Sequence, residues 1–383
     1  MLYRVRVDVL RPWSELPTET LKLIVCRLCL KDNVRLSCVC KKFGKIACSL
    51  RVVNQSPWLL YPTAVGGVIK FFDPSQGKFY VDEIPELRCT KPRCTKDGWV
   101  LFTGDRHCLL NIFTMSKVNL PYYHMLSPSF AFSCAPTSPG CVVFAIETSF
   151  AGGFDSLGVS IGICHPGDAQ WTTFKFQITD VGYFNWGDGP VFCNGLFYCL
   201  SESSYNLLGV FDPQKHTWSI LDVPPPNMPR HLSSAKERYD EESYDEESYD
   251  EDFYDEESYD EERTQHMVEF KGEIILVSVS YPEKPIIFKL DLSKMKWVEM
   301  KSLNGVTLFV SSHSSLAVTD VPGISSNCVY FSKRCNYGKN NYLYSFDDCK
   351  YHPAKQHHEG PFFHKAFWIK PPRKSHLLFD ELY

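Results

Sequence analysis

Residues 13–50 read WSELPTETLKLIVCRLCLKDNVRLSCVCKKFGKIACSL, and the spacing of their apolar residues predicts three short helices. Pro17 stands where the first helix would begin, a position that tolerates the missing proline N–H. The apolar face of that helix, with residues three and four positions apart, consists of Leu21, Ile24, Val25 and Leu28. This stretch is therefore predicted to differ from the rest of the chain, which lacks long helical periods.

The second half of the stretch carries a helix cap and another apolar face. Asp32 can accept hydrogen bonds from the free N–H groups at the start of the next helix. The second stripe at helical spacing consists of Val39, Phe43, Ile46, Ala47 and Leu50. About 38 residues bury too little surface for a robust core, so we expect a partner or a neighbouring domain to complete the unit.

The stretch resembles the F-box motif, whose pattern is LP-x3-L-x2-I-x3-L-x3-D followed by VC-K-x-aromatic. The matching positions are Leu16, Pro17, Leu21, Ile24, Leu28, Asp32, Arg35, Val39, Cys40, Lys41 and Phe43. In that family the helices dock onto the Skp-type linker of an SCF ubiquitin ligase, as an apolar helix face docks into a groove. The resemblance implies linker binding by Leu16, Pro17, Leu21, Ile24, Leu28, Val39, Cys40 and Phe43. Phe43 departs from the family, which often has Trp there.

Three other readings of this stretch remain open. It could be a small helical cap on the larger domain. Its net charge of +5 over residues 13–51 would suit a DNA-binding helix-turn-helix, but the basic residues are spread over all the helices. The spacing of Cys26, Cys29, Cys38 and Cys40 could hold zinc, although it lacks a second C-x2-C pair.

Composition and length set the frame for the remaining sequence. The chain has 383 residues, of which 44% are apolar, and no segment approaches 18 uninterrupted apolar residues. No signal peptide is evident at the N-terminus, so the sixteen cysteines are expected to be reduced thiols in the cytoplasm or nucleus. We divide the chain into a tail (1–12), the helical domain (13–51), a linker (52–60), a β domain (61–360) and a tail or closing strand (361–383).

The β domain repeats one unit, an apolar strand that ends in a turn acid and is followed by an aromatic residue six positions later. The three clear copies pair Asp73 with Phe79, Asp212 with Trp218, and Asp291 with Trp297. In a degenerate copy His165 replaces the acid and Trp171 keeps the spacing. The turns at Asn111 and Asp347 lack the aromatic residue.

This repeat is typical of hairpins, because the turn acid bonds its own backbone and the aromatic residue packs across the strands. Apolar pairs before the hairpins are expected to be joined by tight turns such as Asn194-Gly195 and Lys271-Gly272. Two hairpins make a four-stranded blade, and the spacing fits propeller blades. We therefore predict a mainly β chain, with a divergent propeller of about six blades; a sandwich or two smaller β domains is the alternative.

The whole arrangement resembles plant F-box proteins with a C-terminal kelch-like propeller, the F-box/KIB-like family. Besides the F-box, the similar segments are 56–60, 71–80, 98–102, 109–121 and 193–200. The resemblance implies a non-catalytic substrate adaptor of an SCF-type ligase, which binds a Skp-type linker, a cullin and a target protein. We expect no cofactor or metal, no membrane partner, and a protein target in preference to nucleic acid.

The alternative function is a propeller enzyme or a carbohydrate- or small-ligand-binding module with a helical cap. The sequence contains no phosphate-binding loop, zinc-protease or nucleophile-elbow motif. His352, His357, His358 and His364 lie near Cys335 and Cys349, but their spacing is irregular for a metal site. The catalytic alternative therefore depends on polar residues that converge only in the folded chain.

Residues 239–262 repeat Tyr-Asp-Glu-Glu-Ser with a period of five and carry fifteen carboxylates. Without them the chain has 40 basic and 30 acidic side chains, a net charge of +10. Mutual repulsion and the lack of apolar residues predict disorder. We favour an expanded loop between strands, with a ligand for a basic partner, a nucleic-acid mimic or a site of tyrosine modification as the functional alternatives.

Deleting residues 239–262 should leave the melting temperature nearly unchanged, because a disordered acidic segment contributes little packing. Differential scanning calorimetry of the full chain and the deletion variant measures this. A control variant carries a Gly/Ser linker of equal length. A fall of many degrees in both variants would show that the repeat is ordered against the basic remainder.

Overall fold

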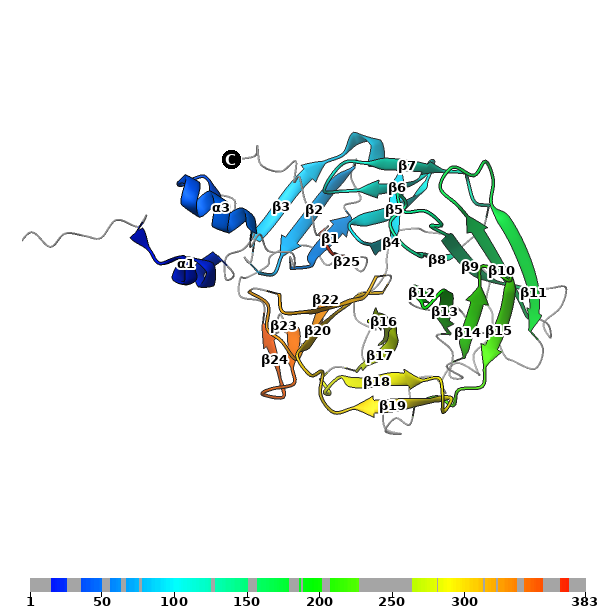
Figure 1. The fold of residues 1–383 in the computed structure, drawn as a ribbon. Coiled ribbons are helices and arrows are strands. Elements are labelled where there is room, and N and C mark those ends of the chain that lie inside the picture. Colours follow the sequence, from blue (N-terminus) through cyan, green and yellow to red (C-terminus); the bar gives the residue numbers. More distant parts are fainter. Residues whose placement is uncertain are drawn as a thin grey trace, which may run out of the picture.

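Figure 1 shows a computed structural model of the chain, in which a ring of β-sheets carries two short helices at one side. The structure describes residues 15–25, 36–49, 56–62, 67–75, 78–124, 128–150, 157–178, 186, 189–201, 207–226, 264–280, 282–312, 314–321, 323–335, 341–353 and 366–371. Residues 239–262 and the predicted cap Asp32 lie outside these ranges.

The helical unit contains α1 (Thr18–Val25) and α3 (Lys41–Ser49), with a helical turn at residues 36–37. Its core consists of the buried Leu21, Val25 and Phe43. Four half-buried side chains surround this core: Leu16, Leu36, Cys40 and Ile46. Both predicted apolar stripes therefore meet inside the unit. Leu28, predicted on the first helix, and Arg35, in the region predicted to hold the middle helix, both fall outside the described residues.

Six sheets form the blades of the ring, and the strands of each blade are named from the innermost outward. Blade 1 consists of β25 (Phe367–Ile369), β1 (Trp58–Pro62), β2 (Val68–Asp73) and β3 (Lys78–Glu83), and the 3-10 turn η2 (Pro85–Leu87) follows it. Blade 2 consists of β4 (Thr90–Lys96), β5 (Trp99–Gly104), β6 (His107–Asn111) and β7 (Lys117–Leu120). Blade 3 consists of β8 (Ser129–Phe132), β9 (Val143–Phe150), β10 (Leu157–Cys164) and β11 (Thr172–Ile178).

The other three blades complete the ring. Blade 4 consists of β12 (Val191–Cys193), β13 (Leu196–Leu200), β14 (Leu208–Asp212) and β15 (Thr217–Leu221). Blade 5 consists of β16 (Thr264–Phe270), β17 (Glu273–Val279), β18 (Ile286–Asp291) and β19 (Lys296–Met300). Blade 6 consists of β21 (Leu316–Thr319), β20 (Val306–Val310), β22 (Cys328–Cys335), β23 (Asn341–Ser345) and β24 (Lys350–Pro353). The predicted mainly β fold with a six-bladed propeller is confirmed.

Blade 6 departs from the simple repeat because it has five strands. β20 runs parallel to β22 and lies between β22 and the innermost strand β21. The other blades are antiparallel throughout. The extra strand adds Leu308 and Val310 to the apolar cluster between blades 5 and 6.

Antiparallel alternation gives the ring two different faces. Turns between first and second strands, and between third and fourth strands, lie on one face, which we call the turn face. In blades 1 to 5, connections between second and third strands, and from each blade to the next, lie on the opposite face, which we call the connection face; the connection from blade 5 to blade 6 is the exception, because β20 starts beside the start of β22. β1 is a second strand, so Trp58 at its start lies on the turn face, and the helical unit joins the ring there.

The predicted tight turns between first and second strands are present. Asn194 and Gly195 both have positive φ angles, 49° and 88°, as do Lys271 and Gly272 at 52° and 81°. Such paired positive angles are required by the two-residue turn that matches strand twist, which favours Asn-Gly and similar pairs. The two turns touch, because Asn194 Nδ2 donates to the Gly272 carbonyl at 2.9 Å.

The predicted turn acids hold the turns between third and fourth strands. Oδ1 of Asp212 accepts from the backbone N–H groups of Gln214 and Lys215 at 2.9 and 3.0 Å. Asp291 does the same with Ser293 and Lys294, and the Ser293 hydroxyl also donates to it. These bonds, that from Ser293 first, lower the pKa of Asp291 to about 2.

Two further turns show the same geometry. Asp73 accepts from the backbone and hydroxyl of Ser75. Asn111 accepts from the N–H groups of Phe113 and Thr114. An acid or amide at the last position of a third strand is therefore a structural device.

The register of the sixth copy differs from the sequence prediction. The residue that ends β23 and pairs with the first residue of β24 is Ser345, opposite Lys350, so Asp347 lies inside the turn. Tyr351 then stands six positions after Ser345 and pairs with Tyr344. The aromatic position is therefore occupied in this copy, and the predicted turn residue, Asp347, is two residues too late.

The repeat aromatics pair with the residue before the turn acid, but their burial varies. Trp297 pairs with Leu290 and is 9% exposed, whereas Phe79 pairs with Phe72 and is 36% exposed. Trp218 is half-buried and packs edge-on against Trp186, with ring centroids 5.1 Å apart. The aromatic position is therefore a packing position whose depth depends on the neighbouring blade.

Trp297→Ala should lower the free energy of unfolding by roughly 3–5 kcal/mol, because a large buried aromatic is lost and leaves a cavity. Phe79→Ala is the matched control at the same repeat position, and its greater exposure predicts a smaller loss. Urea denaturation followed by circular dichroism measures both. Equal losses in the two variants would contradict this blade register.

Candidate functional site

The helical unit exposes apolar side chains beside its small core. Val39 is 64% exposed and Leu23 is 63% exposed. Of the residues predicted to bind the linker, Pro17 is exposed, and Leu16, Ile24 and Cys40 are half-buried. Leu21 and Phe43 are buried in the unit itself, and Leu28 lies beyond the described residues. The predicted set thus divides into side chains that reach the surface and side chains that hold the helices together.

Leu23 was absent from the sequence prediction. It lies off the stripe formed by Leu21, Ile24 and Val25, so helical periodicity alone places it on the solvent side. An apolar residue on the solvent side of an amphipathic helix was the available signal, and an exposed apolar patch marks an interaction surface only when several such residues gather.

The segment before α1 is fixed to α3. Lys42 Nζ donates to the Leu16 carbonyl at 2.7 Å, and the Leu21 N–H donates to the Pro17 carbonyl at 3.0 Å. The Cys40 carbonyl accepts from the Gly44 N–H at 2.8 Å at the start of α3. Leu16 is therefore held beside α3, and Pro17 is fixed to the first turn of α1.

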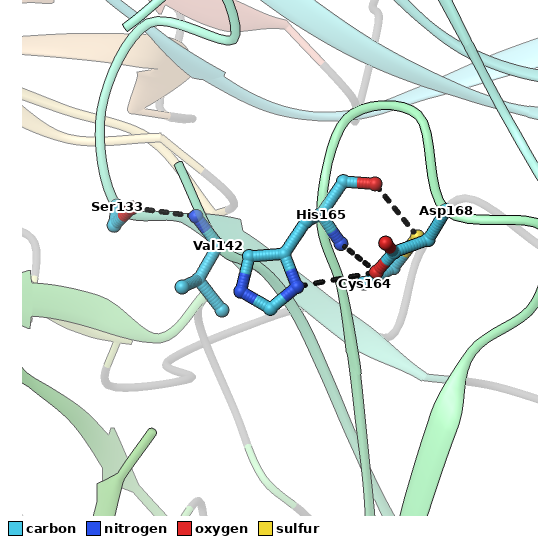
Figure 2. A network of polar contacts seen from close by, with 5 residues as sticks. All are labelled: Ser133, Val142, Cys164, His165 and Asp168. Carbon is cyan, nitrogen blue, oxygen red and sulfur yellow. Dashed lines mark hydrogen bonds and ion pairs between the residues drawn. The ribbon is translucent and has the colours of Figure 1, made fainter. Parts of the chain in front are cut away.

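A second polar arrangement lies at the turn face of blade 3 (Figure 2). Asp168 Oδ2 accepts from the His165 N–H at 2.7 Å and lies 3.1 Å from His165 Nδ1. Cys164 Sγ donates to the His165 carbonyl, and Ser133 Oγ accepts from the Val142 N–H at 2.9 Å. Asp168 thus supplies, from within the turn, the carboxylate that Asp73 and Asp212 supply elsewhere. These contacts hold the turn in place. The hairpin with His165 and Trp171 is therefore kept although histidine stands where the three clear copies have an acid.

Trp171 is fixed by a neighbouring blade. Its Nε1 donates to the Pro121 carbonyl at 2.8 Å, and its ring lies 4.5 Å from that of Tyr123. This contact ties the outer strands of blade 3 to the segment that follows β7. Trp171 therefore links two blades in addition to its place in the hairpin.

A groove of about 1090 Å³ lies at this junction of blades 2 and 3. Its floor includes a row of three residues paired across β9, β10 and β11: Glu147, Ser160 and Lys175. Its walls carry Tyr122, Tyr123 and His124 on one side and Trp171 and Trp218 on the others. The outer part of blade 3 thus turns a polar row toward blade 2.

Tyr123 shapes the inner wall of the groove. It is 6% exposed, and within the described structure its hydroxyl has no hydrogen-bond partner. A Cβ at position 162 would lie 2.4 Å from that hydroxyl, so Gly162 is required for the ring to fit. Burial, and then the nearby Glu147, raise the pKa of Tyr123, so the hydroxyl stays protonated and can donate. The groove therefore offers the acid Glu147 and the base Lys175 to a polar ligand, and the Tyr123 hydroxyl is buried in its inner wall.

The histidine cluster near the C-terminus is only partly described. His352 Nε2 lies 2.7 Å from Asp348 Oδ2 in the turn between β23 and β24, and this bond lowers the pKa of Asp348. His357, His358 and His364 are outside the described ranges. Within the part of the chain that the structure describes, no three His, Cys, Asp or Glu side chains gather closely enough to hold a metal ion. Nor is any described helix long and apolar enough to cross a bilayer.

Comparison with known proteins gives two family matches on this chain. The F-box domain model matches residues 13–54, and the KIB1-4 beta-propeller model matches residues 71–360. F-box/kelch-repeat protein At1g57790 of Arabidopsis thaliana is 35% identical over 95% of this chain and 96% of its own length. F-box/kelch-repeat protein At3g18720 of the same plant is 32% identical over 94% and 86%. Among solved structures, apo AztD from Citrobacter koseri aligns over 83% of this chain and 99% of that chain, with 10% identity and a TM-score of 0.35.

Proposed function

Because this chain belongs to the F-box proteins with a KIB1-4 β-propeller, we propose that it is a substrate-recognition adaptor of an SCF-type ubiquitin ligase. In this proposal the helical unit binds a Skp-type linker and, through it, a cullin. The propeller binds the protein that receives ubiquitin. The ligase complex and its conjugating enzyme supply the chemistry, so the adaptor needs no cofactor, and it would act in the cytoplasm or nucleus.

The observation that supports the linker role most strongly is the exposure of apolar side chains on a unit with a very small core. Among the described residues of the unit, the buried apolar side chains are Leu21, Val25, Phe43 and Ala47, while Val39 and Leu23 remain more than half exposed. Exposed apolar residues on so small a unit are best explained by a partner that covers them, in the manner of helix-in-groove contacts. Leu16, held against α3 by Lys42, and Pro17 would extend the same surface.

The two faces of the propeller support the assignment of linker binding and target binding to different sides of the ring. The helical unit joins the ring at the turn face, where the turns between third and fourth strands are short and the turn between first and second strands of blade 3 spans residues 133–142. The long inter-strand and inter-blade segments of the sequence, including 151–156, 202–206 and 227–263, connect strand ends on the other face. Loops of a rigid scaffold commonly carry binding residues. We therefore assign target recognition to the connection face and to the groove between blades 2 and 3.

Val39→Glu should weaken binding of the Skp-type linker at least about tenfold, because a buried carboxylate would replace an apolar contact at the interface. Leu292→Glu is the matched control, since Leu292 is 45% exposed in a propeller turn and outside the proposed linker surface. Co-precipitation and calorimetric titration with the purified linker, with circular dichroism as the folding check, measure the effect.

The two variants separate the outcomes. Loss of linker binding in Val39→Glu with wild-type binding in Leu292→Glu is the expected result. Undiminished linker binding by a folded Val39→Glu variant would contradict the assignment of this surface. The Leu16→Ala/Pro17→Ala double variant should show the same loss and extends the test to the segment before α1.

A further inference from the structure

A basic residue of blade 2 lies outside the regular pairing of its strand. β4 pairs Pro92 with Phe102 and Cys94 with Leu101, so Arg93 is the additional residue of a β-bulge. Bulges redirect a side chain, and they are frequent beside functional sites. The half-buried guanidinium donates through Nε to the hydroxyl of Thr103 at 2.7 Å.

The described ion pairs do not include Arg93. Burial lowers the pKa of its guanidinium, and no carboxylate contributes to its electrostatic surroundings in the described part of the chain. A partly buried charge is ordinarily paired, because removing it from water costs free energy that a counter-charge offsets. Among the described residues, no counter-charge therefore offsets the free-energy cost of burying the Arg93 guanidinium.

Two histidines stand close to Arg93. His107, the first residue of β6, is 7% exposed, and its Nδ1 has no hydrogen-bond partner among the described atoms. Its ring centroid lies 4.9 Å from that of Tyr122, which lies 4.6 Å from that of His124. Burial lowers the pKa of His107, and the positive charges of Arg93 and His124 lower it further. Arg93 and His124 are thus both close enough to act on His107 as like charges.

The cluster occupies a single place in the fold. β4 and β6 both start at the connection face, and Tyr122 and His124 follow the end of β7 there. Tyr122 and His124 also line the groove between blades 2 and 3. The groove therefore adjoins the cluster at Tyr122 and His124.

We propose that Arg93, His107 and His124 form a binding site for an oxyanion, either a phosphate monoester or a carboxylate. The guanidinium offers a planar set of donors that matches two oxygens of such a group. A protonated imidazole donates from both nitrogens. One bound anion supplies the missing counter-charge for Arg93 and stabilises the protonated form of His107. This inference stands independently of the ligase assignment, because free anions can test it.

The test uses the full chain labelled with 13C at histidine Cε1, and NMR titration with sodium phosphate or sodium acetate against sodium chloride at constant ionic strength. His107 and His124 signals are assigned from the His107→Asn and His124→Gln spectra. We expect saturable shifts of both signals with at least one of the two anions, and a higher pKa of His107 in that anion than in chloride. Saturation with phosphate alone would identify the phosphate class, and saturation with acetate as well would include carboxylates.

Three variants complete the experiment. Arg93→Gln should raise the dissociation constant of the anion at least tenfold. The exposed His124→Gln, which cannot disturb the core, should raise it several-fold. Lys117→Gln is the matched control, because this exposed lysine starts β7 on the opposite face of the same blade. Absence of saturable shifts with both anions, or equal weakening by Lys117→Gln, would overturn the proposal.

Discussion

The ring is closed by the backbone and side chain of Trp368. β25 pairs with β1, which places Trp368 opposite Leu59 and completes the first blade with a strand from the far end of the sequence. The indole Nε1 donates to the Val310 carbonyl at 3.0 Å, and the Trp368 carbonyl accepts from Thr95 at 2.6 Å and Ser314 at 3.1 Å. One fully buried residue therefore joins blades 1, 2 and 6. Without this contact the first blade would present an open edge, which propellers avoid by closure.

Closure gives the other features their positions. The closed ring holds blades 2 and 3 side by side. The groove between them exists because the polar row of blade 3, Glu147, Ser160 and Lys175, faces blade 2 at a fixed distance. The same closure gives the turn face and the connection face separate roles. The proposed linker surface joins at one face, and the proposed oxyanion site with Arg93 lies at the other. In the proposed function, the two faces would therefore bind separate partners.

The sequence predicted what is local. Asp212 with Trp218 and Asp291 with Trp297 were found because a turn acid and its aromatic partner are six residues apart, and the fold class followed from their repetition. Ser345 with Tyr351 was missed because serine is a weaker turn signal than aspartate. The parallel insertion of β20 and the groove between blades 2 and 3 depend on contacts between residues far apart in the chain, so no local pattern indicates them. In the helical unit, the motif could not separate the buried Leu21 and Phe43 from the exposed Val39, because periodicity does not show which side a partner covers.

The dependence of the ring on β25 can be measured with two shortened chains. One ends after residue 371 and keeps β25, and the other ends after residue 365 and lacks it. The midpoint of urea unfolding, followed by circular dichroism, should be the same for the full chain and the first variant. The second variant should unfold at a clearly lower urea concentration and lose hydrogen-exchange protection in β1. An unchanged midpoint in the variant that lacks β25 would contradict closure by this strand.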